Sequence, residues 1–150
     1  ELPAKGIHLV VLGDGKSAME FKNYAKETAF SNIIHFLGFK ENPFIYYKNA
    51  VFLMLTSKIE GFPMVLIESL ACGTPVVSYD CPTGPKEIVR HEKNGLLVPK
   101  DDKSEMTSAL NRMINDVALY EELCFYAKQS VSHLSMEKIA KEWKALIEQN

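Results

Sequence analysis

The thirty residues VFLMLTSKIEGFPMVLIESLACGTPVVSYD (51–80) contain only four charged side chains. An apolar run, VFLML (51–55), precedes a helical pattern over 63–72, and a second apolar run, PVVSY (75–79), follows it. The helical segment has a proline in its first turn and a glycine just past its end, where these residues are favoured. The stretch therefore predicts a strand, a helix and a second strand, the unit from which parallel sheets are built.

The same alternation of short apolar runs and amphipathic segments extends over most of the chain. The other predicted strands are IHLVVLG (7–13), NIIHFLGF (32–39) and GLLVP (95–99). Further helices are predicted at about 16–29, 42–49, 85–91, 103–115, 117–133 and 135–148. We expect one α/β domain over residues 1–150, with a Rossmann-like parallel sheet, helices on both of its faces and a helical C-terminal tail.

Composition excludes several classes of protein. Seventeen Lys and Arg against nineteen Asp and Glu give a net charge of −2, without the basic surplus of a nonspecific nucleic-acid binder. Three cysteines without C-x-x-C spacing predict neither a disulfide framework nor a zinc site. Apolar stretches fall well short of the roughly 20 residues of a membrane span, and the first ten residues do not resemble a signal peptide. We expect a cytoplasmic protein.

Glycines follow the first three predicted strands: Gly13 and Gly15, then Gly38, then Gly61. Ligands bind at the carboxyl ends of the strands in open α/β sheets, where a helix N-terminus favours an anion. Two known phosphate motifs do not fit, because Val10 replaces the first glycine of a Walker loop and no acidic residue follows as the dinucleotide fingerprint requires. A plain tight turn at Gly13 to Gly15 explains the pair equally well.

Two glutamates stand out in the sparsely charged stretch. Glu60 lies in the loop before Pro63, and Glu68 lies in a helix that is apolar on nearly every side. A buried carboxylate without a partner costs several kcal/mol, so Glu68 requires one. Helical side chains lean toward the N-terminus, which directs Glu68 toward the loop that contains Glu60. The two carboxylates could bind hydroxyls beside a phosphate; alternatively, Glu68 bonds only to a neighbouring loop and Glu60 is solvated.

These residues resemble a known family, the retaining glycosyltransferases of the group 1 type, whose fold is GT-B. The resemblance is to their C-terminal domain and covers roughly residues 7 to 100. The stretches that carry it are VVLGDG (10–15), IIHFLGF (33–39), SKIEGFPMVLIESLACGTPVVSYDCPTGPKEIV (57–89) and NGLLVP (94–99). The third includes the E-x7-E element, from Glu60 to Glu68.

The resemblance assigns roles to individual residues. It implies that Glu60 is catalytic, contacting the donor sugar near the reacting centre, and that Glu68 binds the ribose hydroxyls. The backbone between them would contact sugar and diphosphate, through Gly61, Phe62, Pro63 (carbonyl only), Met64, Val65 and Leu66. The base would lie against the loop after the second strand, formed by Gly38, Phe39 and Lys40, near the turn with Gly13 and Gly15.

The resemblance also implies substrates and partners. The donor would be a nucleoside-diphosphate sugar, with UDP expected, and the acceptor a glycan or a lipid-linked glycan of surface polysaccharide biosynthesis. Transfer would need neither metal nor cofactor, since the leaving phosphate serves as base, and no nucleic-acid partner is expected. The first strand of the domain, with its Arg and Lys, and the N-terminal acceptor domain have no counterpart in the sequence. We therefore expect an inactive fragment of a longer enzyme, which could associate peripherally with the inner face of the membrane.

Two other functions remain open: a nucleotide-sugar binding module without catalysis, and a GT-B epimerase acting on sugar nucleotides. Two segments are also ambiguous. The run CPTGPKEI (81–88) could line the donor pocket or form a rigid turn. Phe44, Tyr46 and Tyr47 could meet an acceptor domain or pad the sheet, and padding is the favoured interpretation.

Overall fold

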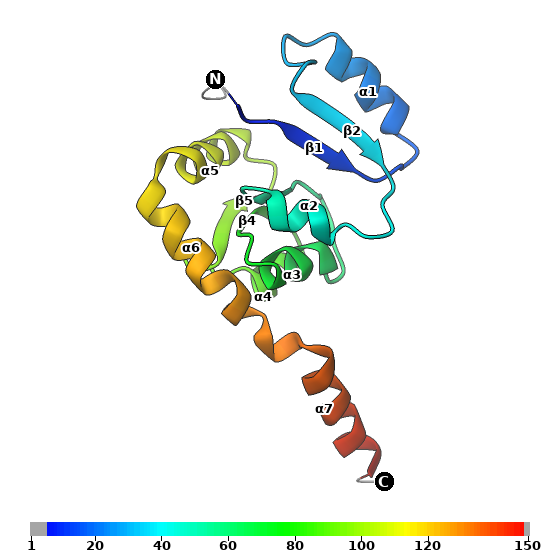
Figure 1. The fold of residues 1–150 in the computed structure, drawn as a ribbon, viewed down its shortest axis with the longest axis vertical. Helices are drawn as coiled ribbons and strands as arrows, with labels where there is room; N and C mark the ends of the chain where they lie inside the picture. Colours follow the sequence, from blue (N-terminus) through cyan, green and yellow to red (C-terminus); the bar gives the residue numbers. More distant parts are fainter. Residues whose placement is uncertain (1–5, 149–150) are drawn as a thin grey trace. The chain divides into compact units, whose positions relative to one another are not determined.

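The computed structural model describes residues 6–148 and divides into two compact units, Glu1–Pro43 and Phe44–Asn150 (Figure 1). All five strands predicted from the sequence are present in the described part of the chain, and every strand pairing there is parallel.

The first unit contains β1 (Leu9–Leu12), α1 (Ala18–Lys26) and β2 (Ile34–Gly38). The two strands pair side by side in a parallel ladder whose register shifts after Val11, so that Leu12 lies opposite Gly38. At this end of the ladder the Gly13 N–H donates to the Gly38 carbonyl oxygen at 2.9 Å. The two glycine turns predicted at the carboxyl ends of the strands therefore meet at one edge of the sheet.

The second unit contains a three-stranded parallel sheet in the order β3-β4-β5. Its elements are α2 (Phe44–Asn49), β3 (Leu53–Leu55), α3 (Met64–Ala71), β4 (Val76–Asp80), α4 (Pro85–Ile88) and β5 (Gly95–Pro99). The central strand β4 is buried along Val76–Tyr79. This continuous burial is what a strand covered on both faces requires, and it explains why the segment is apolar without strict alternation.

Helices cover both faces of this sheet, as predicted. On one face Val76 of β4 packs in a core with Leu66 and Leu70 of α3 and with Ile88 of α4. On the other face Val77 packs in a second core with the helix that follows β5. The buried side chains of that second core are Val77, Tyr79, Leu96, Val98, Met106, Ala109, Met113 and Leu123. α3 is thereby fixed against the sheet by its apolar face.

The C-terminal part of the second unit is helical, as predicted. It comprises α5 (Lys103–Asn115), α6 (Val117–Ser130), a 3-10 turn η1 (Ser132–Leu134) and α7 (Met136–Glu148). The Asp102 carboxylate caps α5 by accepting from the Glu105 N–H at 2.9 Å, and the Asp116 carboxylate caps α6 in the same way at 3.0 Å. Such caps satisfy amides that lack partners within the helix.

The helix α4 is shorter than the predicted helix over 85–91, because it ends at Ile88. The reason is the buried side chain of Asn94, whose Oδ1 accepts from the Arg90 N–H at 2.8 Å and whose Nδ2 donates to the Ile88 carbonyl at 3.0 Å. These bonds replace the next turn of helix. The helix predicted to reach residue 133 likewise ends at Ser130 and tightens into η1.

Candidate functional site

The turn from Glu60 to Pro63 connects β3 to α3 and ends at the N-cap residue Pro63. Pro63 is buried, whereas Gly61 and Phe62 are exposed and Glu60 is half-buried. The Pro63 carbonyl accepts from the Leu66 N–H at 3.0 Å, which closes the first helical turn. The turn is thus anchored at its proline and open to solvent at the two residues before it.

Free backbone donors lie in the Glu60 turn and in the first turn of α3. Within the described residues 6–148, the N–H groups of Gly61, Phe62, Met64 and Val65 have no backbone hydrogen-bond partner. Leu66 differs, because its side chain is fully buried and its N–H is engaged by Pro63. An anion beside this turn would meet the exposed donors and the positive end of the helix dipole, with Leu66 serving as anchor.

A second turn supports the first from behind. The Thr83 hydroxyl donates to the Glu60 carbonyl oxygen. Gly84 has φ +93°, and a Cβ atom at this position would lie 2.4 Å from Pro63 Cδ and 3.0 Å from the Gly61 carbonyl oxygen. No side chain fits this gap, so glycine is required both by its conformation and by the close approach of the two backbones. Within the run 81–88, the turn before α4 therefore packs against the Glu60 turn, and whether it also lines a donor pocket stays a prediction.

Glu68 has the partner that its position required. The Tyr47 hydroxyl, from α2, donates to Glu68 Oε2 at 3.1 Å. Tyr47 is buried and Glu68 is half-buried. Burial, reinforced by the neighbouring Glu68 carboxylate, raises the pKa of Tyr47 to about 12, so the phenol keeps its proton even above pH 10, where an ordinary tyrosine loses it. The partner is therefore a helical tyrosine and not a neighbouring loop, while a role of Glu68 in binding hydroxyls stays a prediction.

A chain of hydrogen bonds fixes α2 to the end of α3. The buried Thr74 hydroxyl donates to the Tyr47 carbonyl oxygen at 2.6 Å. Thr74 is in turn bonded twice to Ser69, through its own N–H at 3.0 Å and through its carbonyl oxygen, which accepts from the Ser69 hydroxyl at 3.1 Å. The backbone of Tyr47 is therefore tied to the helix that carries Glu68.

Comparison with known proteins identifies the family. The sequence profile described as Glycosyl transferases group 1 matches residues 2–130. The chain belongs to this family. The resemblance inferred from the motifs is thereby confirmed, while the roles of Glu60 and Glu68 within it stay predictions.

Two relatives place this group 1 chain among named glycosyltransferases. It is 31% identical over 140 residues to an uncharacterized glycosyltransferase of Haemophilus influenzae, covering 93% of the chain and 40% of the relative. It is 35% identical over 136 residues to an N-acetylgalactosamine-N,N'-diacetylbacillosaminyl-diphospho-undecaprenol 4-alpha-N-acetylgalactosaminyltransferase of Campylobacter jejuni, covering 91% and 37%. The chain thus spans about 40% of the length of these relatives.

A solved structure confirms the fold. HepE of Anabaena, in complex with UDP, superposes with a TM-score of 0.88 at 21% identity, over 96% of this chain and 41% of that one. The group 1 chain has the α/β architecture of a GT-B C-terminal domain, with a helical tail. At this level of identity the likeness concerns the fold alone.

The residues predicted to hold the base lie in the first unit of this group 1 chain. Gly13 and Gly15 follow β1 and Gly38 ends β2, so the glycines lie at the carboxyl ends of the strands as predicted, while their role in binding stays a prediction. Phe39 follows β2 with 73% of its surface exposed, and Lys40 is half-exposed. A donor site that combines these residues with the Glu60 turn of the second unit stays a prediction.

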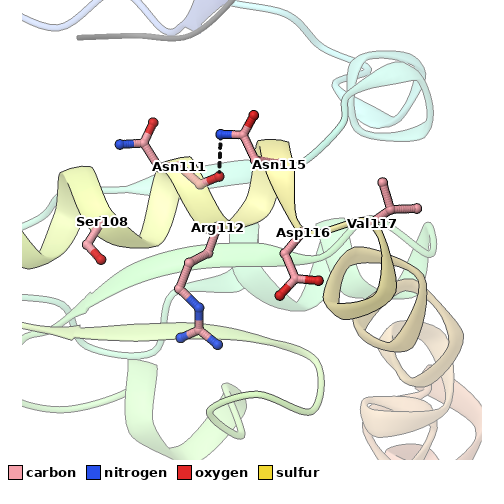
Figure 2. Close-up of a pocket in the computed structure, with 6 residues that line it drawn as sticks. All are labelled: Ser108, Asn111, Arg112, Asn115, Asp116 and Val117. Carbon is pink, nitrogen blue, oxygen red and sulfur yellow. Dashed lines mark hydrogen bonds between the residues drawn. The ribbon is translucent and has the colours of Figure 1, made fainter.

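A shallow concavity lies where α5 meets α6 (Figure 2). It is lined by Ser108, Asn111, Arg112, Asn115, Asp116 and Val117. The Arg112 guanidinium donates to Glu92 Oε1 at 2.5 Å, and this hydrogen bond holds the pKa of Glu92 below its usual range. Asn115 Nδ2 donates to the Asn111 carbonyl at 2.9 Å, and Asp116 caps α6. These polar groups bond to the ends of α5 and α6 or to Glu92, and none of the lining residues is predicted to bind the sugar donor. We therefore interpret the concavity as a structural junction between the two helices.

Residues 6–148 offer neither a metal site nor a membrane span. No three or more His, Cys, Asp or Glu side chains gather there in a way that could hold a metal ion. None of the helices described combines the length and the apolar character needed to span a bilayer.

Proposed function

We propose that this chain is the donor-binding part of a retaining glycosyltransferase. The enzyme transfers a sugar from a UDP-sugar to a glycan or lipid-linked acceptor in the biosynthesis of a surface polysaccharide or glycoconjugate. The observation that carries the proposal is the Glu60 turn, because exposed backbone donors at the start of α3 lie between two glutamates of one continuous segment.

The chemistry of this segment suits the two parts of a sugar nucleotide. Backbone N–H groups of Gly61, Phe62, Met64 and Val65 would bind the diphosphate and the sugar, since they are donors at the positive end of a helix. Glu68 would accept hydrogen bonds from the ribose, because an ionised carboxylate is an acceptor only. Glu60 would accept from a hydroxyl of the donor sugar, near its anomeric carbon.

The ligands and acceptors of similar proteins support the choice of substrates. HepE was solved with UDP, and the Campylobacter relative is named for an undecaprenol-linked acceptor. In the proposed reaction the bond from the anomeric carbon to the phosphate breaks on the face where the acceptor oxygen bonds. The acceptor proton passes to the leaving phosphate oxygen, so we expect no requirement for a metal ion or a cofactor.

We further propose that the chain works within a longer enzyme, in keeping with its 40% share of the length of its relatives. The acceptor would bind to an N-terminal domain, and the enzyme would act in the cytoplasm, with peripheral association at the inner face of the membrane. Residues 1–150 alone should bind nucleotide without turnover. Sugar transfer by this segment alone would contradict that inference.

Isothermal titration of UDP against the full-length enzyme tests the donor site. Glu68→Ala should weaken UDP binding by roughly tenfold or more, as expected for the loss of hydrogen bonds to a charged acceptor. Glu121→Ala, which removes an exposed carboxylate of α6, is the matched control and should leave affinity unchanged. Unchanged affinity in Glu68→Ala would overturn the assignment to the ribose.

A turnover assay separates the remaining functions. Glu60→Ala should abolish most sugar transfer in the full-length enzyme while the protein still binds UDP, whereas a binding module has no turnover to lose. An epimerase would release free products without any acceptor present. Product formation that depends on the acceptor and on Glu60 would support the transferase.

A further inference from the structure

We propose that Tyr47 is a positioning residue for the donor: it holds the Glu68 carboxylate in the orientation that receives the ribose hydroxyls. The inference rests on the proposed function of Glu68 and extends it to a residue 21 positions earlier in the chain, on a different helix.

The hydrogen bond from Tyr47 engages only one of the two carboxylate oxygens of Glu68. The Tyr47 hydroxyl donates to Oε2 at 3.1 Å, and among residues 6–148 Oε1 has no hydrogen-bond partner. A carboxylate has about four acceptor positions, so a single phenol leaves most of them open. Glu68 is half-buried, so part of its surface remains exposed to solvent.

The phenol is itself fixed in place. Its ring is buried and makes an edge contact with Phe44, with ring centres 6.0 Å apart at 88°. The Tyr47 carbonyl is bonded to Thr74, which is bonded to Ser69, the residue after Glu68. Donor and acceptor of the Tyr47–Glu68 bond therefore belong to one closed network across α2 and α3, which leaves little room for the hydroxyl to move.

Fixing the carboxylate before the ligand arrives should raise affinity. A free glutamate has three side-chain torsions and loses that freedom on binding, whereas a carboxylate already bonded to Tyr47 has lost much of it. This contribution stabilises the bound donor equally in the ground state and in the transition state. Its loss should therefore raise KM and leave kcat unchanged.

The test compares two nucleotides in the full-length enzyme: UDP, and 2′,3′-dideoxy-UDP, which lacks both ribose hydroxyls. Tyr47→Phe keeps the ring and removes only the donor. It should weaken UDP binding roughly three- to tenfold and leave the affinity for the dideoxy nucleotide nearly unchanged. The KM for the UDP-sugar should rise by a similar factor at constant kcat. Tyr46→Phe makes the same chemical change at the adjacent, half-buried position. It should leave the affinity for both nucleotides unchanged.

A double variant and a melting curve complete the test. Tyr47→Phe combined with Glu68→Ala should bind UDP no more weakly than Glu68→Ala alone, because the tyrosine acts through the glutamate. Thermal unfolding shows whether Tyr47→Phe is folded at the assay temperature. If Tyr47→Phe weakens both nucleotides equally, its role is structural and the proposal is overturned.

The outcomes also separate this inference from the function on which it rests. If Glu68→Ala removes the preference for UDP over the dideoxy nucleotide and Tyr47→Phe leaves it intact, only the role of Tyr47 is overturned. If Glu68→Ala leaves the preference intact, the ribose assignment and the Tyr47 inference both fail.

Discussion

Gly84 lies against Pro63 so closely that a Cβ atom at position 84 would be 2.4 Å from Pro63 Cδ. The turn after β4 thus sets the position of the turn after β3. Because Thr83 also bonds to the Glu60 carbonyl, the proposed catalytic glutamate is positioned by a residue 23 positions later in the chain. Substitutions in the turn after β4 should therefore disturb the Glu60 turn.

Replacing Gly84 by alanine should displace the Glu60 turn. The methyl group cannot be accommodated at 2.4 Å from a proline ring and 3.0 Å from the Gly61 carbonyl, so the turn must shift. We expect Gly84→Ala to weaken UDP binding at least tenfold and to lower the free energy of unfolding by about 1–3 kcal/mol. Calorimetric titration and urea unfolding measure the two effects.

Gly73→Ala is the matched control for the backbone strain. Gly73 has a similar φ, +87°, but no atom lies within 4 Å of the position that a Cβ atom would take there. The control should lose only the part of the free energy of unfolding that is due to backbone strain, and it should keep its affinity for UDP. Equal losses of UDP affinity in both variants would mean that strain alone, and not the contact with Pro63, is responsible.

Removing the Thr83 hydroxyl should loosen Glu60 without displacing the turn. Thr83→Val keeps the branched shape and deletes the donor to the Glu60 carbonyl. We expect kcat of the full-length enzyme to fall several-fold, with a smaller change in KM, because Glu60 is proposed to act at the reacting sugar. Thr107→Val removes a comparable hydroxyl-to-carbonyl bond, to Lys103 in α5, and should leave both parameters unchanged.

How much of this arrangement the sequence could predict depends on distance along the chain. Glu60 and Glu68 could be identified as candidate site residues because they are isolated charges, one just before an apolar helix and one within it. The limits of α3 followed from local punctuation by proline and glycine. Tyr47 and Gly84 could not be assigned, because their roles arise only when α2 and the turn after β4 pack against the α3 segment. From its residue type, Tyr47 is expected to pad the sheet. Its hydroxyl partner, Glu68, becomes visible only once α2 and α3 are packed together.

The Tyr47–Glu68 pair also predicts alkaline sensitivity. The pKa of Tyr47 is raised from 10.0 to about 12 by burial and by Glu68. Between these values the unfolded chain releases the phenol proton and the folded chain keeps it, so stability is unaffected below pH 10 and falls as the pH rises toward 12. We expect a loss on the order of 2 kcal/mol across this window, measured by urea unfolding at successive pH values.

The contribution of Tyr47 can be separated from that of other tyrosines. Burial also raises the pKa of Tyr120 to about 12. Tyr47→Phe should remove part of the alkaline loss, Tyr120→Phe another part, and the double variant more than either. A Tyr47→Phe variant with the same dependence on pH as the parent protein would show that the buried phenol does not titrate as inferred.

Asn94 provides a prediction about stability without function. Its side chain is fully buried and makes three hydrogen bonds, to the backbone of Ile88 and Arg90 and to the Ser130 hydroxyl at 2.9 Å. Asn94→Ala would leave the buried Ile88 carbonyl without this partner and remove the part-buried bonds to Arg90 and Ser130, which should cost about 1–3 kcal/mol in urea unfolding. Asn115→Ala, which removes one exposed bond, should cost about 0.5 kcal/mol or less. Asn94 fixes the end of α4 to α6, and among the described residues it has no hydrogen bond to the Glu60 turn. The folded Asn94→Ala variant should therefore bind UDP with unchanged affinity; weaker binding would show that the end of α4 also helps to position the Glu60 turn.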